Sequence, residues 1–200
     1  RVLFRSIEHC RRGPEEIGVP MPTVSSYFVP GITEMDGWIY TLFDDNVDGE
    51  AMLNKSDPFP VRLARRDADR ADASWQVPET TYAQAIFPRG LQVVPTENGA
   101  LVVAYTGSLG EDAAKFRRHV YVHRVRWPAG GEQSWSKAIQ FGEAAPGAIP
   151  ALRAEGLRVD MAWLETTDGK TVLGQAFSED GGKSWSEAFY REEICVCVYV

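Results

Sequence analysis

Residues 172 to 185 read Val172-Leu173-Gly174-Gln175-Ala176-Phe177-Ser178-Glu179-Asp180-Gly181-Gly182-Lys183-Ser184-Trp185. The apolar run predicts a β-strand, and the Ser, Asp and Gly residues that follow predict a turn. Asp180 can accept backbone N–H hydrogen bonds across that turn, and Trp185 can pack beneath it. We therefore expect Asp180 to stabilise a hairpin and not to act as a catalytic acid.

The same two elements occur three times along the chain. Each copy begins with a glycine-led apolar strand, at residues 36–43, 98–105 and 155–163. Each copy ends in a second strand whose turn closes on Ser74-Trp75, Ser134-Trp135 or Ser184-Trp185, at spacings of 60 and 50 residues. Such self-similarity indicates stacked units of one four-stranded sheet each. We expect the three tryptophans to occupy equivalent buried sites in successive sheets.

This repeat predicts an all-β chain that forms a β-propeller of four-stranded antiparallel blades. Residues 1–200 then form a single propeller domain of about three to four blades, with blades at approximately residues 21–80, 81–142 and 143–200. A four-stranded sheet alone leaves both faces under-buried, and radial stacking covers them. A β-sandwich with coincidental Ser-Trp pairs is the alternative, but it explains the strands and not the double periodicity.

Composition excludes several classes of function. The 200 residues are 44% hydrophobic and 24% charged, as in an ordinary globular chain. A formal net charge of -7 argues against a nucleic-acid partner, and no apolar run approaches the roughly 20 residues of a membrane helix. Cys10, Cys195 and Cys197 are too few for a disulfide framework, although a bond from Cys10 to either of the others is open. His119 and His123 lack a cysteine or carboxylate at ligand spacing, so we predict no metal and no cofactor.

The turn quoted above carries a family resemblance. Its residues Ser178, Asp180, Gly182, Ser184 and Trp185 match the Asp-box pattern Ser-x-Asp-x-Gly-x-Ser/Thr-Trp at every specified position. The chain thus resembles the Asp-box (BNR-repeat) propellers of the sialidase, or neuraminidase, superfamily. The resemblance implies part of a six-bladed ring, completed by a missing segment or a partner chain. It also implies a secreted or periplasmic protein.

A second resemblance concerns the candidate site. Sialidases carry an Arg-Ile-Pro motif about ten residues before a glycine-led strand, with a catalytic Asp in the loop after that strand. Arg89 in Phe87-Pro88-Arg89-Gly90-Leu91 and Asp112 stand at these intervals around Gly99, although Gly-Leu replaces Ile-Pro. The resemblance implies that Arg89 binds a substrate carboxylate and that Asp112 is the general acid/base. Because adjacent strands run antiparallel, both should lie on one rim of the channel, together with Asp44, Asp45 and Glu165.

These resemblances imply a sialidase-like glycoside hydrolase that removes a terminal sialic acid or a related acidic sugar from glycans such as sialoglycoconjugates. The alternative is a non-catalytic propeller that binds a glycan or a protein, since the tyrosine nucleophile and two further arginines of sialidases have no assigned positions here. A third possibility is a glycoside hydrolase that uses two of the rim carboxylates Asp44, Asp112 and Glu165.

Overall fold

The computed structural model describes residues 30–44, 58–70, 72–109, 111–115, 117–145 and 148–191. Over these residues the chain consists of antiparallel strands and one four-residue helix. In order they are β1 (Gly31–Met35), β2 (Trp38–Asp44), β3 (Phe59–Asp67), β4 (Ala83–Pro95), β5 (Leu101–Ser108), α2 (Glu111–Ala114), β6 (His119–Arg126), β7 (Ser134–Trp135), β8 (Ile139–Glu143), β9 (Ala151–Glu155), β10 (Arg158–Thr167), β11 (Lys170–Ser178) and β12 (Phe189–Arg191). The predicted all-β class is confirmed. Asp45 and the three cysteines lie outside the described residues.

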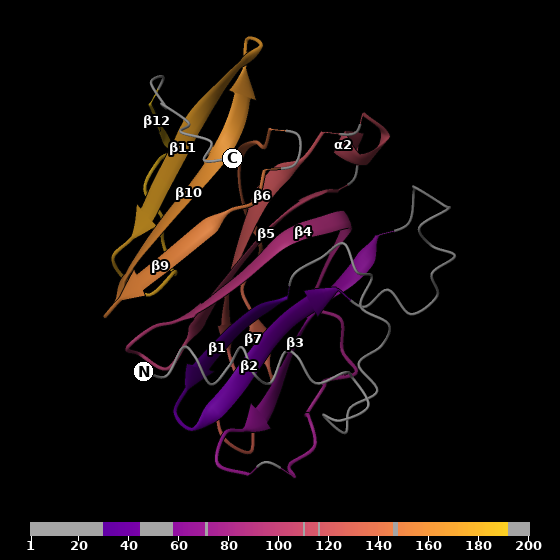
Figure 1. The fold of residues 1–200 in the computed structure, drawn as a ribbon, viewed down its shortest axis with the longest axis vertical. Coiled ribbons are helices and arrows are strands. Elements are labelled where there is room, and N and C mark those ends of the chain that lie inside the picture. Colours follow the sequence, from indigo (N-terminus) through magenta and orange to yellow (C-terminus); the bar gives the residue numbers. More distant parts are fainter. Residues whose placement is uncertain are drawn as a thin grey trace, which may run out of the picture.

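The strands form three successive groups, which we call blades 1, 2 and 3 (Figure 1). Blade 1 contains β1, β2 and β3, and Gln76 pairs with β3 at the outer edge. Blade 2 contains β4, β5 and β6, and both β7 and β8 pair with the outer side of β6. Blade 3 contains β9, β10, β11 and β12 in that order. Every pairing is antiparallel, as expected for propeller blades.

The first strands of the blades lie beside one another around a common axis. Gly31 of β1 abuts β4 so closely that a Cβ atom there would lie 2.7 Å from the carbonyl oxygen of Leu91. On the other side, β4 contacts β9. The chain passes from the outer edge of one blade to the inner strand of the next, because β4 pairs first with β3 and then with β5. This order is that of a β-propeller, so the predicted fold class is confirmed.

The three Ser-Trp pairs occupy equivalent positions in the three blades. The residue after each tryptophan donates its backbone N–H to the third strand of its blade, and each of these hydrogen bonds measures 2.8 Å. The pairs are Gln76 with Arg65, Ser136 with Arg124, and Ser186 with Phe177. The predicted equivalence therefore holds. The expected burial was wrong, since Trp75, Trp135 and Trp185 are half-buried at the sheets' outer edges, where solvent reaches them.

Two equivalent arginines join neighbouring blades. Arg65 of blade 1 donates from Nη1 to the carbonyl oxygen of Trp127 at 2.9 Å, and Arg124 of blade 2 donates from Nε to that of Gly181 at 3.1 Å. Each arginine thus forms a hydrogen bond to the backbone of the next blade. The acceptor lies in or near the turn before that blade's Ser-Trp pair. Phe177 takes the same position in blade 3, and the Arg158 guanidinium lies 4.6 Å from its ring centroid. The third position therefore offers no guanidinium for such a bond.

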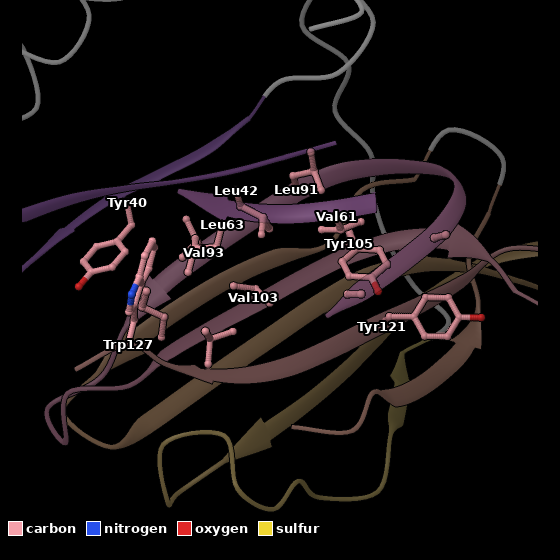
Figure 2. Packing of buried hydrophobic residues seen from close by; sticks show 14 residues of the cluster. Tyr40, Leu42, Val61, Leu63, Leu91, Val93, Val103, Tyr105, Tyr121 and Trp127 are labelled. Carbon is pink, nitrogen blue, oxygen red and sulfur yellow. The ribbon is translucent and has the colours of Figure 1, made fainter. Parts of the chain in front are cut away.

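The core lies between the blades, on both faces of β5. Leu101, Val103 and Tyr105 face a cluster shared with β2, β3 and β4, which Figure 2 shows from close by. The alternate residues Val102 and Ala104 face a second cluster shared with blade 3. Because side chains of a strand alternate between its two faces, an apolar run without polar alternation predicts burial on both. All eight residues of β5 are buried accordingly.

A buried histidine lies in the first of these clusters. The Nδ1 atom of His123 lies 3.0 Å from the carbonyl oxygen of Ser136, and its Nε2 atom lies 3.1 Å from the hydroxyl of Tyr105. The carbonyl can only accept, so the proton sits on Nδ1 and Tyr105 donates to Nε2. Burial lowers the pKa of His123 because the charged ring would lose its hydration. The folded protein therefore holds this ring neutral.

The pH dependence of stability tests this assignment. The unfolded chain binds a proton at His123 below about pH 6.5, whereas the folded chain resists it, so stability should fall as pH decreases from about 6.5 toward the lowered pKa. Urea denaturation at a series of pH values should show this slope, and His123→Gln should reduce it. The matched control His119→Gln removes a different imidazole and should retain the His123 contribution. An unchanged slope in His123→Gln would contradict the assignment.

Blade 3 offers a second test, at a close approach between two of its strands. Trp163 is 1% exposed, and a Cβ atom on Gly174 would lie 2.4 Å from Cε2 of its indole. Gly174→Ala should therefore lower the free energy of unfolding by about 1–3 kcal/mol, the usual cost of overpacking. Trp163→Phe removes the ring that the new methyl group would overlap. In urea denaturation, the double variant should therefore lose less free energy of unfolding than the two single variants lose together. Strict additivity would show that the two residues do not collide.

Candidate functional site

The inner strand of blade 2 is distorted around Arg89. The pairing of β4 with β5 shifts register on both sides of Arg89, between Ile86 and Arg89 and again between Arg89 and Gln92. Phe87 has a positive φ of 48°, which is unusual for a bulky residue. Register breaks and strained backbone are enriched at functional sites because they redirect side chains. Arg89 therefore stands at the most irregular point of this strand.

Gly90 is required at this distortion. Its φ is 59°, and a Cβ atom there would lie 2.4 Å from Cβ of Ile149. The glycine thus permits both the left-handed backbone and the close approach of the segment before β9. A β-branched residue at position 90 could not take this conformation without moving Ile149.

A second arginine, Arg118, contacts the distorted part of β4. Arg118, just before β6, donates a hydrogen bond from its guanidinium to the carbonyl oxygen of Phe87. Burial and the positive charge of Arg89 together lower the pKa of Arg118 to about 10. Arg118 is thus bonded to the distorted part of β4, and its positive charge lies close enough to that of Arg89 for the two to repel. No local sequence signal marks Arg118, because only the fold brings it to Arg89.

Asp112 lies in α2, in the loop after β5. Its Oδ2 atom is 3.2 Å from Nε2 of His119, the first residue of β6. The other ring nitrogen of His119, Nδ1, lies 3.1 Å from the carbonyl oxygen of Gly142. The Asp112 carboxylate and the His119 ring are thus held within ion-pair distance of one another. Carboxylates and imidazoles are both groups that serve in general acid–base catalysis.

The Asp112 carboxylate also affects the phenol of Tyr121. The pKa of Tyr121 is raised to about 12, mainly by burial and further by the negative charge of Asp112. His119 packs edge-on against the same ring, at 6.4 Å between centroids. At the solvent side, Arg117 Nε lies 3.8 Å from Glu143 Oε2. The rim at this end of blade 2 therefore carries charges of both signs.

Arg89 and Asp112 belong to the same end of blade 2. Arg89 pairs with Thr106 near the end of β5, and α2 follows directly after β5 at that end of the sheet (Figure 1). Arg118 and His119 are adjacent in the sequence and link the two residues, because Arg118 lies near Arg89 and His119 contacts Asp112. Projection of both side chains into one cleft stays a prediction.

Two of the acids expected at the channel mouth are buried instead. Asp44 is 1% exposed at the end of β2, and Glu165 is 9% exposed in β10. Trp163 donates from Nε1 to Oε2 of Glu165 at 3.0 Å. A Cβ atom on Gly142 would lie only 1.7 Å from Oε2 of Glu165, so the Glu165 carboxylate packs directly against Gly142 of blade 2. The expectation that these two acids are open to solvent was therefore wrong, and packing against blade 2 is the cause for Glu165.

The turn at Asp180 is a closed hydrogen-bond network. Its Oδ1 accepts the backbone N–H groups of Lys183 and Ser184, each at 2.9 Å, and its Oδ2 accepts the Ser184 hydroxyl at 2.6 Å. Ser178 donates to Oδ1 at 2.8 Å and accepts the N–H of Gly182 at 2.8 Å. These hydrogen bonds, led by those from Ser184, hold the pKa of Asp180 well below its usual range. Trp185 follows, half-buried against Phe141 at 5.8 Å between ring centroids.

Neither a metal cluster nor a membrane-spanning helix occurs in the part of the chain that the structure describes. No three His, Cys, Asp or Glu side chains converge there as a metal site would require. No helix there has the length and apolarity to cross a bilayer.

No protein-family model and no curated protein matches the sequence, whereas two solved structures of glycosidases superpose on part of the chain. A thermostable family-43 glycoside hydrolase superposes with a TM-score of 0.45 and 11% identity over 80% of this chain and 53% of its own. A putative glycosidase from Bacteroides thetaiotaomicron VPI-5482 superposes with a TM-score of 0.46 and 18% identity, over 89% of this chain and 58% of its own. The chain thus spans little more than half the length of either protein.

Replacement of Asp180 tests its role in the turn. Asp180→Ala leaves two backbone N–H groups and two hydroxyls without their acceptor, so it should lower the melting temperature by several degrees. Asp180→Asn keeps one acceptor oxygen, so it should lower the melting temperature less than Asp180→Ala does. Affinity for any glycan should stay unchanged in both variants, measured by calorimetric titration. Lost binding at an unchanged melting temperature would instead mark Asp180 as a functional acid.

Proposed function

We propose that this chain belongs to a glycan-active propeller whose channel mouth recognises an acidic sugar. In this proposal Arg89 and Arg118 bind the sugar's carboxylate, and Asp112 with His119 transfers the proton needed to cleave the glycosidic bond. Removal of a terminal sialic acid is the specific reaction that we propose, in keeping with the resemblance of residues 87–135 to a sialidase blade.

The observation that carries the proposal is the meeting of two arginines at the distorted inner strand. Arginine presents its N–H donors in a planar fork that matches a carboxylate, and a second guanidinium beside it increases the attraction. The cost of holding Arg118 partly buried near Arg89 is recovered when an anion binds between them. A carboxylated sugar supplies that anion together with hydroxyl groups for further hydrogen bonds.

The pair of Asp112 and His119 supports the catalytic part of the proposal. Proton transfer to or from a reacting group needs a side chain that can exist in either protonation state at working pH. The Asp112 carboxylate lies 3.2 Å from the His119 imidazole, so the geometry brings two groups of this kind together. Asp112 would act on the leaving oxygen, and His119 is a positioning residue that sets the direction of the carboxylate.

One observation favours the non-catalytic alternative, a propeller that binds a glycan or a protein. Sialidase chemistry uses a tyrosine nucleophile, and Tyr121 is the phenol whose pKa responds to Asp112. It is buried, and its pKa is raised to about 12, so it is a weak nucleophile at neutral pH. The two-carboxylate alternative lacks such support, because Glu165 is buried and bonded to Trp163.

Conservative variants separate binding from catalysis. Arg89→Lys and Arg118→Lys should each weaken the binding of N-acetylneuraminic acid by about tenfold or more, because lysine cannot make the paired bonds. Asp112→Asn should depress hydrolysis of a fluorogenic sialoside by roughly 10²-fold while sugar binding persists. Arg153→Lys, which alters an arginine bonded to Glu155 on the exposed surface, is the matched control.

The results divide the alternatives. Binding without hydrolysis in the unmodified protein would support the non-catalytic propeller. If acidic-sugar binding is absent, or is equal in the unmodified protein and both arginine variants, the proposed recognition site is wrong.

A further inference from the structure

A groove lies between the outer edges of blades 1 and 2, at the end of the sheets where β2 begins and β6 ends. Its volume is about 600 Å³, within the range of small-molecule sites. One wall is the segment from Gln76 to Tyr82 in blade 1, and the other is the turn from Gly130 to Gln133 in blade 2. None of Arg89, Asp112, Arg118 and His119 lines the groove, so it is separate from the site described above.

The floor of the groove is a fixed aromatic surface. The Arg65 guanidinium lies 4.4 Å from the ring centroid of Trp38 and 4.2 Å from that of Trp127. Its donors are used by the side-chain oxygen of Gln76 and the carbonyl oxygens of Trp127 and Pro128. Tyr40 packs edge-on against Trp127, as Figure 2 shows. These contacts hold both indoles in place before any ligand arrives, which lowers the entropic cost of binding.

The walls carry polar groups that have no partner elsewhere in the described chain. Within those residues, the carboxylates of Glu79 and Glu132 form no ion pair, and the hydroxyl of Tyr82 and Nε1 of Trp38 form no hydrogen bond. All four side chains line the groove. The ring of Tyr82 is held by stacking on Trp135, at 6.1 Å between centroids and 6° between planes. The groove therefore offers donors, acceptors and ring surfaces together.

The distribution of charge selects the class of ligand. Arg65 is 3% exposed and has no acidic partner in the described residues, so its positive charge lies beneath the floor and disfavours a cation. Two carboxylates on the opposing walls disfavour an anion. A neutral molecule with many hydroxyls and apolar ring faces can use both acceptors, both donors and the aromatic surface. Neutral sugars have these properties.

We propose that this groove binds a neutral oligosaccharide, with its sugar rings against Trp38 and Tyr82 and its hydroxyls bonded to Glu79 and Glu132. The inference stands on the groove alone and does not require the acidic-sugar site. It gives the protein a second glycan contact, away from the channel mouth.

Calorimetric titration with cellohexaose, xylohexaose and mannohexaose tests the proposal, with choline and glucuronate as cationic and anionic probes. At least one hexasaccharide should bind and change the tryptophan fluorescence. Tyr82→Ala should weaken that binding about tenfold, because the stacking surface is lost. Glu132→Gln, an isosteric change at an exposed position, should weaken it about threefold. Tyr82→Phe should retain most of the affinity, which would show that the ring and not the fold is responsible.

The controls keep the two sites apart. Arg89→Lys should leave hexasaccharide affinity within twofold, and Tyr82→Ala should leave acidic-sugar binding unchanged. Tighter binding of choline or glucuronate than of every hexasaccharide would overturn the proposal. So would the absence of hexasaccharide binding, or equal affinity in the unmodified protein, Glu132→Gln and Tyr82→Ala.

Discussion

The burial of both faces of β5 is the constraint on which the described structure depends. A lone antiparallel sheet can leave one face in water, but an apolar strand such as Ala100-Leu101-Val102-Val103-Ala104-Tyr105 cannot. One sheet must therefore cover each side, and blades 1 and 3 do so through the two clusters. Burial of apolar surface drives this stacking, and it contributes roughly 25 cal/mol of free energy per Å². The arginines Arg65 and Arg124 then fix the offset between neighbouring blades.

Stacking on both sides also determines where chemistry can occur. Side chains in the middle of the strands are enclosed, so Glu165 becomes part of the packing and loses access to solvent. Strand ends and breaks in pairing leave polar groups accessible beside the stacked faces. Arg89 lies at such a break in β4, and Asp112 follows the end of β5. The opposite ends of the same sheets leave the aromatic groove between two turns. Both candidate sites therefore follow from one principle of packing.

Much of the fold could be predicted because its signals are local. The Ser-Trp repeat predicted equivalent positions in successive sheets, and the hydrogen bonds after Trp75, Trp135 and Trp185 agree with this equivalence, although not with the predicted burial. The candidate site was harder, because its partners come together only through the pairing of β4, β5 and β6. Arg118 and His119 are sequence neighbours, yet one meets Arg89 and the other meets Asp112. Burial of Asp44 and Glu165 depended on which blade faced them, and no local pattern contains that information.

The continuity of β4 has a consequence for how the molecule opens. This strand pairs with β3 over its first residues and with β5 over the rest, so a single stretch of backbone belongs to two blades. Between blades 2 and 3, by contrast, the strands β8 and β9 are separate, and Ala144 and Glu165 make an isolated bridge. Amide exchange through subglobal opening follows such cooperative units. We therefore expect blades 1 and 2 to exchange their amides as one unit and blade 3 to open at a lower free energy.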